Sequence, residues 1–481
     1  RAAALVRRSA VHRHLGHYEN ALKDAHDAIE LTKPPFGAPQ NYAEALRAEG
    51  LVYYQLGELN DAQWKLRESY RRFQDLGLES DAAKVLLDLG VVYSVRADYD
   101  QSEKCYADSL EYWQAVQNPL WLANVLNNIG MIQYLRSQYE QAVITLERSL
   151  AYAKLANPRL EGYALTSLGD LYRDVRALKE ARQAYNQALI VLKETGDLTL
   201  DIYLTLALAL LDRISGNFSS AQEGISSAMK KAQSSGSRYE INLCALEQAV
   251  LDLKKGNVEN LEGVFSQLEN FFTAAGYQLE GFKAATYLRL TTLKTGSDML
   301  FDNHESISDG VEVNFGQALV QIGLEFREEL IQSQSHANPL SSWTQLLANV
   351  NAFEQLIPQI HRIIRHHSST VEFTNPKLTI RGFGRMQVKV GNRTITGKDW
   401  KTQVVRDLFF YLLSHTEGVT KEEIGLAFWP EADSDTVKLR FKNTIYRLRR
   451  AIGKESITFE DDLYRFNRAI DYDYDVDTFN F

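Results

Sequence analysis

Small, apolar and polar positions recur over the first two thirds of the chain with a period close to forty residues. A small residue marks each copy, at steps of 40, 40, 39, 40 and 40: Gly50, Gly90, Gly130, Gly169, Ala209 and Ala249. A bulky apolar residue follows nine positions later, and a mostly small residue three positions after that. An earlier copy fits through Ser9, Tyr18 and Ala21, which makes about seven repeats. Self-similarity at a fixed period of this length predicts a stacked repeat architecture.

Each copy predicts two amphipathic helices joined by a short turn. Polar breaks separate the copies, and Pro119 and Pro158 stand in two of them. Such a helix pair cannot bury its own apolar face, but stacked pairs bury a continuous core. The sequence therefore predicts an α-α superhelix over residues 1–296. Two further helical patterns, Phe315–Gln334 and Ser341–His367, predict a helical cap or connector over residues 297–371.

The repeat resembles the tetratricopeptide repeat (TPR) in its small–aromatic–alanine spacing. Its period exceeds the usual ~34 residues, as in the longer TPR-like arrays of bacterial regulators. The resemblance implies a concave groove that binds a peptide or protein partner. A rigid spacer without a ligand is the alternative reading of the same pattern.

The pattern of apolar and polar residues changes after residue 371, and residues 372–470 predict a small α+β domain. LTIRGF, MQVKV and RTIT alternate apolar and polar residues and predict short antiparallel strands. A helix is expected over Thr402–His415, with an apolar stripe through Val405, Leu408, Phe409 and Leu412. Thr420 and Glu423 form a capping box for a helix ending at Phe428. Ser434 or Asp435 is expected to cap a third helix, and a hairpin over 456–467 follows. Strands, three helices and a terminal hairpin predict a winged helix-turn-helix.

The third helix, Val437–Ile452, carries a basic face opposite an apolar one. Val437, Phe441, Ile445, Leu448 and Ile452 share the apolar face at 100° per residue. Basic, amide and aromatic side chains occupy the opposite face together with Leu439. Arginine and asparagine are the residues that read guanine and adenine in the DNA major groove. The alternative is a solvated basic helix surface without a ligand.

The C-terminal domain resembles the OmpR/PhoB-type DNA-binding domain, in the version of SARP-type and MalT-like bacterial transcriptional regulators. The resemblance rests on LTIRGFG, Trp400, RDLFFYLL, the helix end FWP and YRLRRAIG. It implies DNA contacts by these residues: Lys438, Arg440, Lys442, Asn443, Tyr446, Arg447, Arg450 and, in the wing, Arg465. It also implies an RNA polymerase contact in the loop before the third helix, through Glu431, Asp433 and Ser434. The hairpin turn Glu460-Asp461-Asp462 departs from a DNA-contacting wing, because its carboxylates repel phosphate.

Charge separates the two regions. The 481 residues carry a net charge of −9, whereas residues 376–481 hold 18 Lys and Arg against 16 Asp and Glu. An acidic array that binds something other than DNA is therefore expected beside a local basic reader. Cys105 and Cys244, the only cysteines, favour the reducing cytoplasm, and no apolar run approaches the ~20 residues of a membrane span.

No pattern predicts an enzyme, a cofactor or a metal site. GxxxxGK[ST], HExxH, GxSxG and CxxC motifs are absent from the sequence. His361, His366 and His367 lack nearby acidic or thiol partners in the sequence and read as a solvated helix end. The alternating aspartates of residues 471–481 lack the spacing of a calcium loop and predict an acidic C-terminal tail or a strand edge. The chain starts at Arg1, inside a repeat, so it is expected to be part of a longer protein, and the resemblance allows an ATPase switch module upstream.

The sequence thus favours a bacterial regulator of transcription, with an activator as the expected sign of control. Promoter DNA, RNA polymerase, a peptide or protein in the repeat groove, and a second copy on DNA are the partners that this reading allows. A non-enzymatic interaction scaffold, whose winged helix docks protein, is the alternative.

Overall fold

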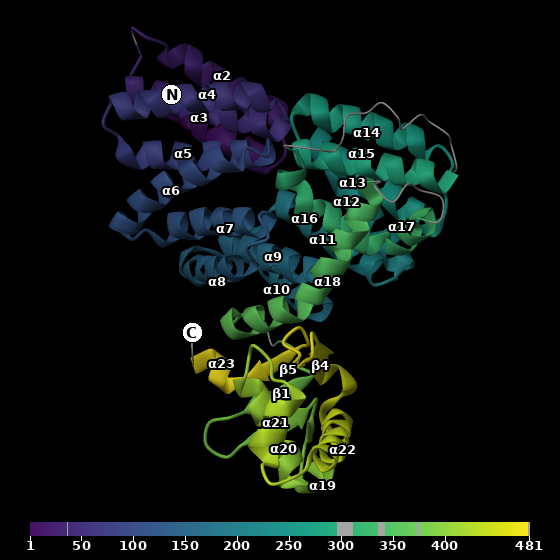
Figure 1. Ribbon diagram of the computed structural model, residues 1–481. Coiled ribbons are helices and arrows are strands. Elements are labelled where there is room, and N and C mark those ends of the chain that lie inside the picture. Colours follow the sequence, from purple (N-terminus) through teal and green to yellow (C-terminus); the bar gives the residue numbers. More distant parts are fainter. Residues whose placement is uncertain (36, 296–310, 335–341, 372, 374–375, 480–481) are drawn as a thin grey trace. The chain divides into compact units, whose positions relative to one another are not determined.

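The computed structural model describes the chain except residues 36, 296–310, 335–341, 372, 374–375 and 480–481 (Figure 1). It divides into two compact units. The first comprises Arg1–Asn351 and His367–Glu372, and the second comprises Ala352–His366 and Phe373–Phe481.

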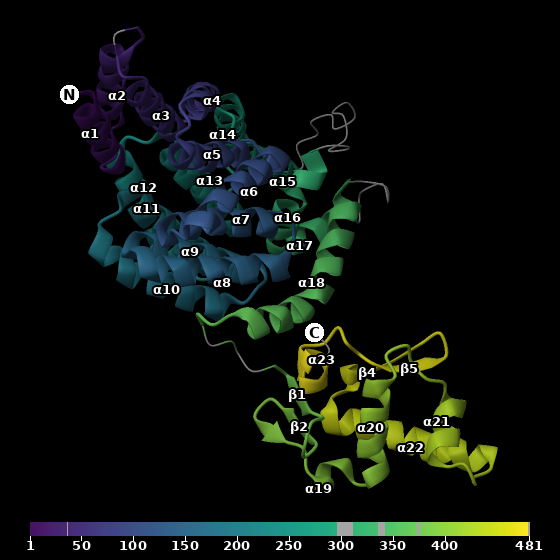
Figure 2. The same cartoon turned by 90° about the vertical axis from the view of Figure 1, so that its left-hand side faces the viewer.

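Seven antiparallel helix pairs build most of the first unit, as the repeat pattern predicts (Figure 2). The first helices of the pairs are α1 (Ala2–His14), α3 (Pro39–Leu56), α5 (Glu79–Val95), α7 (Pro119–Leu135), α9 (Pro158–Asp174), α11 (Leu198–Ile214) and α13 (Arg238–Lys255). The second helices are α2 (Tyr18–Thr32), α4 (Leu59–Asp75), α6 (Tyr99–Val116), α8 (Tyr139–Ala156), α10 (Leu178–Thr195), α12 (Phe218–Ser235) and α14 (Leu261–Ala275). The predicted superhelix of about seven forty-residue repeats is confirmed.

Close packing within each pair explains the small residue of the repeat. A Cβ atom on Gly90 would lie 2.3 Å from the ring of Tyr106, and one on Gly169 would lie 2.4 Å from the ring of Tyr185. Both tyrosines are buried, and each lies sixteen positions after its glycine. In the α11–α12 pair the glycine is on the second helix instead of the first. A Cβ on Gly224 of α12 would lie 2.8 Å from the Cβ of Ala209 of α11. The small residues of the repeat therefore mark the point in each of these pairs where the two helices approach most closely.

A buried serine bond also recurs inside successive pairs. Its donors are the hydroxyls of Ser69, Ser109 and Ser149, forty residues apart. The acceptors are the backbone carbonyls of Ala43, Ala83 and Ala123, at distances of 2.7–2.9 Å. Each pair thereby satisfies a buried hydroxyl within itself, as buried polar groups require.

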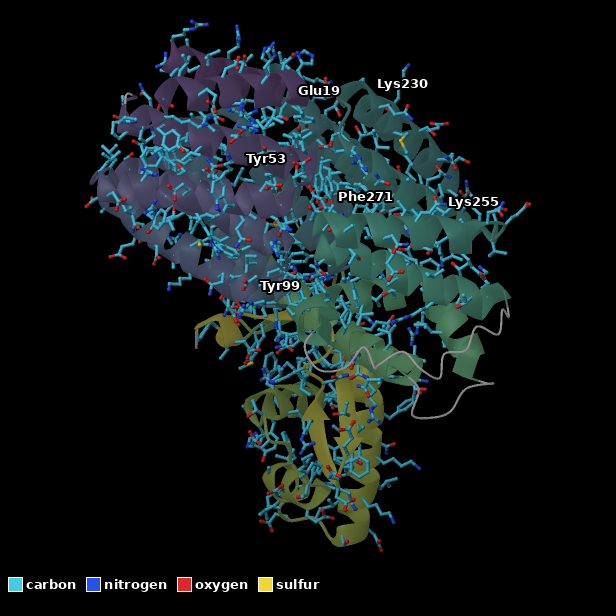
Figure 3. The ribbon with its side chains drawn as sticks, turned by 90° about the horizontal axis from the view of Figure 1, so that it is seen from above. Glu19, Tyr53, Tyr99, Lys230, Lys255 and Phe271 are labelled. Carbon is cyan, nitrogen blue, oxygen red and sulfur yellow. The ribbon has the colours of Figure 1, made fainter. Side chains whose placement is uncertain are left out.

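The superhelix brings early and late repeats into contact. The Tyr277 hydroxyl donates a hydrogen bond to the Tyr54 carbonyl at 3.3 Å. A Cβ on Gly276 would lie 3.2 Å from the side chain of Leu59. Figure 3 labels Tyr53 of α3 and Phe271 of α14, which belong to the early and late helices on either side of this contact.

Four helices follow the pairs: α15 (Gln278–Thr295), α16 (Val311–Glu325), α17 (Arg327–Gln334) and α18 (Ser342–His367). The pattern predicted over 315–334 is thus split into α16 and α17. The pattern predicted over 341–367 corresponds to α18, and Ser341 lies outside the described residues. In both Figures 1 and 2, α16 lies among the repeat helices.

The second unit combines two sheets with several helices, of which α20, α21 and α22 contribute most of the helical residues to its core. Strands β1 (Leu378–Arg381), β2 (Gln387–Val390), β3 (Arg393–Thr394) and β6 (Tyr472–Tyr474) form a sheet of order β3-β2-β1-β6. β1 pairs antiparallel with β2 and parallel with β6. The helices are α19 (Gly397–Trp400), α20 (Gln403–Ser414), α21 (Lys421–Phe428), α22 (Ser434–Ile452), the 3-10 turn η1 (Lys454–Ser456) and α23 (Asp475–Phe479). Strands β4 (Ile457–Glu460) and β5 (Leu463–Phe466) form the hairpin.

This arrangement confirms the predicted small α+β C-terminal region, with its strands, helices and terminal hairpin. The stripe predicted on α20 is buried in full, at Val405, Leu408, Phe409 and Leu412. Two details differ from the prediction. Asp433, rather than Ser434 or Asp435, caps α22, because its carboxylate accepts the Thr436 N–H. The segment predicted as an acidic tail or a strand edge forms edge strand β6, and buried Tyr472 joins the core. The tail alternative is therefore wrong for Tyr472–Tyr474.

Candidate functional site

Helix α22 is held on the second unit by one buried face. Phe441, Ile445, Leu448 and Ile452 are buried, and Phe441 packs edge-on against Tyr464 of β5 at 4.8 Å between ring centroids. The α21–α22 approach depends on a glycine, because a Cβ on Gly425 would lie 2.7 Å from the side chain of Val437. The orientation of α22 is therefore fixed by α20, α21 and the hairpin.

The opposite face of α22 brings together seven of the eight predicted DNA contacts. All seven are exposed: Lys438, Arg440, Lys442, Asn443, Tyr446, Arg447 and Arg450. The structure shows no ion pair between the five cations of this set and any carboxylate in the described part of the chain. Arg449, by contrast, is partly buried and donates to the Ile457 carbonyl at 2.9 Å. We call the seven exposed residues the α22 basic face.

The wing residue Arg465 has a structural partner. Its Nε atom donates to the Glu417 carbonyl at 2.9 Å, and its side chain packs over Gly418. Val419 and Tyr464 exchange backbone hydrogen bonds of 3.1 and 2.8 Å, so the α20–α21 turn is attached to the hairpin. The structure thus places Arg465 on β5, where it holds the α20–α21 turn.

The hairpin tip is acidic and tightly turned. Asp461 and Asp462 have φ angles of +52° and +61°, which is typical of a type I′ turn. Both side chains are exposed. The repulsion expected between this turn and phosphate therefore has a structural basis.

The loop before α22 holds the three residues assigned to polymerase contact. Glu431 is exposed, whereas Asp433 caps the helix. The Asp433 carboxylate accepts hydrogen bonds from the Thr436 N–H and hydroxyl, each 2.9 Å long, and these lower its pKa. Ser434 is the exposed first residue of α22. Of the three, Glu431 is the carboxylate without a capping role.

Two large apolar side chains are exposed on α21 and α22; the sequence placed Leu439 on the same face as the basic residues but did not single out Leu426. Leu426 of α21 is 73% exposed and Leu439 of α22 is 63% exposed. The period of the KEEIGLAF segment, with Ile424 buried, could have placed Leu426 on the outer side of its helix.

The three histidines do not converge on one site. His366 Nε2 lies 3.4 Å from a carboxylate oxygen of Asp473, and His367 Nε2 lies 3.5 Å from one of Glu140. Within the described ranges, no group of three or more His, Cys, Asp and Glu side chains could hold a metal ion. None of the described helices has the length and apolar content needed to cross a bilayer.

The first helices of the repeats carry a buried polar network, which the sequence did not reveal. The Arg173 guanidinium contacts Asp170 at 2.8 Å and Asp174 at 2.6 Å. Asp170 also accepts the hydroxyls of Tyr185 and Tyr203 at 2.6 and 2.7 Å. Burial raises the pKa of Asp170. Burial is also the largest single effect on Asp174 and acts to raise its pKa. The charge and hydrogen bond of Arg173, together with the Tyr134 hydroxyl, outweigh it and hold the pKa of Asp174 below its usual value.

A second buried cation lies one repeat further along. Arg213 is 4% exposed and contacts Glu247 at 2.8 Å and Glu325 of α16 at 2.7 Å. Helix α16 therefore supplies a carboxylate to the interior of the repeat array.

Glu240 is a buried carboxylate in the first turn of α13. Its side chain is almost fully covered, and its Oε2 atom has no hydrogen-bond partner within the described structure. Burial raises the pKa of Glu240 to about 7. The folded chain thus binds this proton more tightly than the unfolded chain does.

The stability of the array should therefore fall as the pH rises from about 4.5 to about 7. Below the ordinary glutamate pKa of 4.5 the stabilising proton is bound in both states, and above pH 7 its contribution is lost. Glu240→Gln should remove this dependence and raise the free energy of unfolding at pH 8 by up to about 3 kcal/mol. Urea unfolding at pH 5 and pH 8 measures the difference. Glu19→Gln, at an exposed first-turn position of α2, is the control, and equal pH slopes in all three proteins would contradict the assignment.

Comparisons with known proteins agree with the repeat architecture. Residues 81–154, which span most of α5–α8, match the family model of the tetratricopeptide repeat. A Rap protein solved in complex with competence and sporulation factor is 12% identical, with 76% of this chain and 99% of that chain covered and a TM-score of 0.51. This likeness shows a shared fold.

Two further solved structures resemble the chain more weakly. The Rap conjugation gene regulator of the plasmid pLS20, in complex with a Phr peptide, is 14% identical over 60% of this chain and 75% of that chain, with a TM-score of 0.46. Aspartyl phosphate phosphatase F from Bacillus subtilis is 13% identical over 64% and 97%, with a TM-score of 0.40. No curated protein matched the sequence.

Proposed function

We propose that the chain is a DNA-binding regulator of transcription, in which the TPR-like array receives a peptide or protein signal. The α22 basic face is the observation that carries the proposal. Its five cations project from a helix whose other face is fixed in the core, and the structure shows no carboxylate paired with them among the described residues. Neutralising phosphates and releasing their counterions is the favourable outcome for such a cluster.

The side chains between these cations suit base recognition. Asn443 can form two hydrogen bonds with adenine, and arginine can form two with guanine. A helix of the width of α22 fits the major groove of B-form DNA. Phosphate contacts by the lysines would set the register, while Asn443 and one or two arginines would read sequence.

The resemblance to OmpR/PhoB-type domains supports promoter DNA as the ligand and activation as the sign of control. Under this proposal Glu431 is the residue most available to RNA polymerase, because Asp433 is engaged in capping α22. Pairing of two copies on DNA and residence in the cytoplasm belong to the same proposal. The chain acts without catalysing a reaction.

Selection from random duplex DNA tests this function directly. The full chain should enrich a defined sequence, and its affinity for that sequence should fall steeply as salt rises. Scrambled duplex of equal length is the control. The proposal is overturned if no sequence is enriched and if the chain binds duplex DNA at low salt no better than an acidic protein without a DNA-binding site does.

The exposed leucines beside the basic face favour a second candidate, a protein-docking module. Leu426 and Leu439 offer apolar surface that DNA contacts do not require. In this reading a leucine substitution such as Leu439→Ser abolishes partner binding, whereas arginine substitutions on α22 leave it unchanged.

A further inference from the structure

Helix α16 lies across the first helices of successive repeats. One row of its side chains, at intervals of four residues, contacts them in order. Gln317 donates to the Tyr134 hydroxyl of α7 at 3.4 Å, and Gln321 donates to the Asp174 carbonyl of α9 at 2.9 Å. Glu325 accepts from Arg213 of α11 at 2.7 Å. Residues four apart share one helix face, so a single face of α16 spans three repeats.

A second row of α16 and α17 is apolar and buried. It consists of Phe315, Ile322, Phe326 and Leu330. Phe315 stacks on Phe282 at 4.8 Å, and Phe326 packs against Tyr287 at 5.7 Å between ring centroids. The segment is thus an amphipathic pair of consecutive helices, α16 and α17, broken only at Phe326 and seated among the repeats in the manner of a helical ligand in a groove.

The polar side of this seat is basic. Lys254 of α13 donates to the Glu325 carbonyl at 2.7 Å and lies 4.6 Å above the Phe326 ring. Glu329, four residues after Glu325, lies 3.7 Å from Lys254 and 3.8 Å from Lys294. Two carboxylates one helical turn apart therefore face three cations, of which Arg213 is the most buried.

The fit of α16 leaves polar groups unsatisfied. Arg213 Nε, Gln317 Oε1 and Glu329 Oε2 are buried and form no hydrogen bond within the described residues. A buried polar group without a hydrogen-bond partner is costly, because it has lost its hydration without replacement. Arg213 is itself a nearly buried cation, and its two terminal nitrogens donate to Glu325 and Glu247. A ligand with better placed acceptors would therefore gain free energy that α16 does not.

We propose that this seat is the binding site for an acidic amphipathic helix of a partner protein, and that α16 is a resident competitor for it. The proposal rests on the assignment of the array as a receptor for a protein signal and specifies the chemistry of that signal. The partner helix presents two carboxylates four residues apart, with an aromatic residue adjoining the first. Arg213, Lys254 and Lys294 receive the carboxylates, and Phe265 and Tyr287 line the apolar side.

The first test loosens the resident helix without changing its seat. The full chain carrying Glu325→Gln and Glu329→Gln keeps Arg213, Lys254 and Lys294 intact. A fluorescent peptide of residues 311–334 should bind this variant at least tenfold more tightly than it binds the unchanged chain, as measured by anisotropy. A peptide with glutamine at both acidic positions is the matched control and should lose that binding. Equal binding of the two peptides, or none by either, overturns the proposal.

Hydrogen exchange separates a displaceable helix from a structural one. In the double glutamine variant, amides of residues 315–325 should exchange faster, while those of α7, α9 and α11 keep their protection. Loss of protection throughout the array would mean that α16 is an integral core helix and would overturn the proposal. Both measurements are made without DNA, so failure of DNA binding leaves their outcome unaffected, and DNA binding can be observed whether or not the peptide binds.

Discussion

Arg440→Ala combined with Arg447→Ala should weaken binding of the full chain to its selected duplex by roughly 30-fold or more, because each base-contacting arginine contributes about 1–3 kcal/mol. Both side chains are exposed, so the fold should survive. The dependence of affinity on salt should become shallower by about one unit for each lost phosphate contact. Anisotropy titrations at several salt concentrations measure both quantities.

A second arginine pair provides the control for this experiment. Arg381 and Arg385 are exposed at the β1–β2 end of the same unit, outside α22. Their double alanine variant changes the net charge equally and should retain most of the affinity and the sequence preference. If both pairs reduce binding by the same factor, the effect is one of total charge, and α22 is not the reader.

Arg173→Ala should destabilise the repeat array by about 3–5 kcal/mol, the cost of leaving buried charge without its partner. Asp170 and Asp174 are both largely buried and share this guanidinium. Asp174 also accepts the Tyr134 hydroxyl, so the loss reaches α7 as well as α9. Urea denaturation followed by circular dichroism measures the change.

Arg182→Ala is the matched control for Arg173→Ala. Arg182 pairs with Asp212 at 2.6 Å, but its side chain is 40% exposed. Exposed pairs contribute about 0–1 kcal/mol, so this variant should unfold close to the unchanged chain. Adding Asp174→Asn to Arg173→Ala should restore part of the stability. Similar losses for both arginines would show that the buried network contributes no more than a surface pair.

The repeats could be predicted because their packing requirement is local. Gly90 and Tyr106 belong to adjacent helices of one pair, and the same contact recurs in the next pairs, so a fixed spacing appears in the sequence. The capping box of Thr420 and Glu423 is similarly local, and the structure contains it as expected. Helix α22 was predictable as amphipathic for the same reason, with Phe441 and Leu448 on its buried side.

Contacts between distant residues left no such signal. Gln317 and Tyr134 are 183 residues apart, and the local sequence pattern of α16 does not indicate that this helix packs among the repeats. Strand β6 was ambiguous because its pairing with β1 joins residues almost a hundred positions apart. The α22 cap shifted to Asp433 because three neighbouring side chains could each serve as a cap, and backbone geometry selected one.

The contact between Tyr54 and Tyr277 changes the mechanical character of the array. In an open solenoid each repeat contacts only its neighbours, so the terminal repeats, which have one neighbour each, unfold first. Here a hydrogen bond spans 223 residues of sequence and ties an early repeat to a late one. Closing so long a loop costs entropy and slows folding. Once this contact has formed, the repeats between Tyr54 and Tyr277 should unfold together in one cooperative transition rather than one by one from the termini.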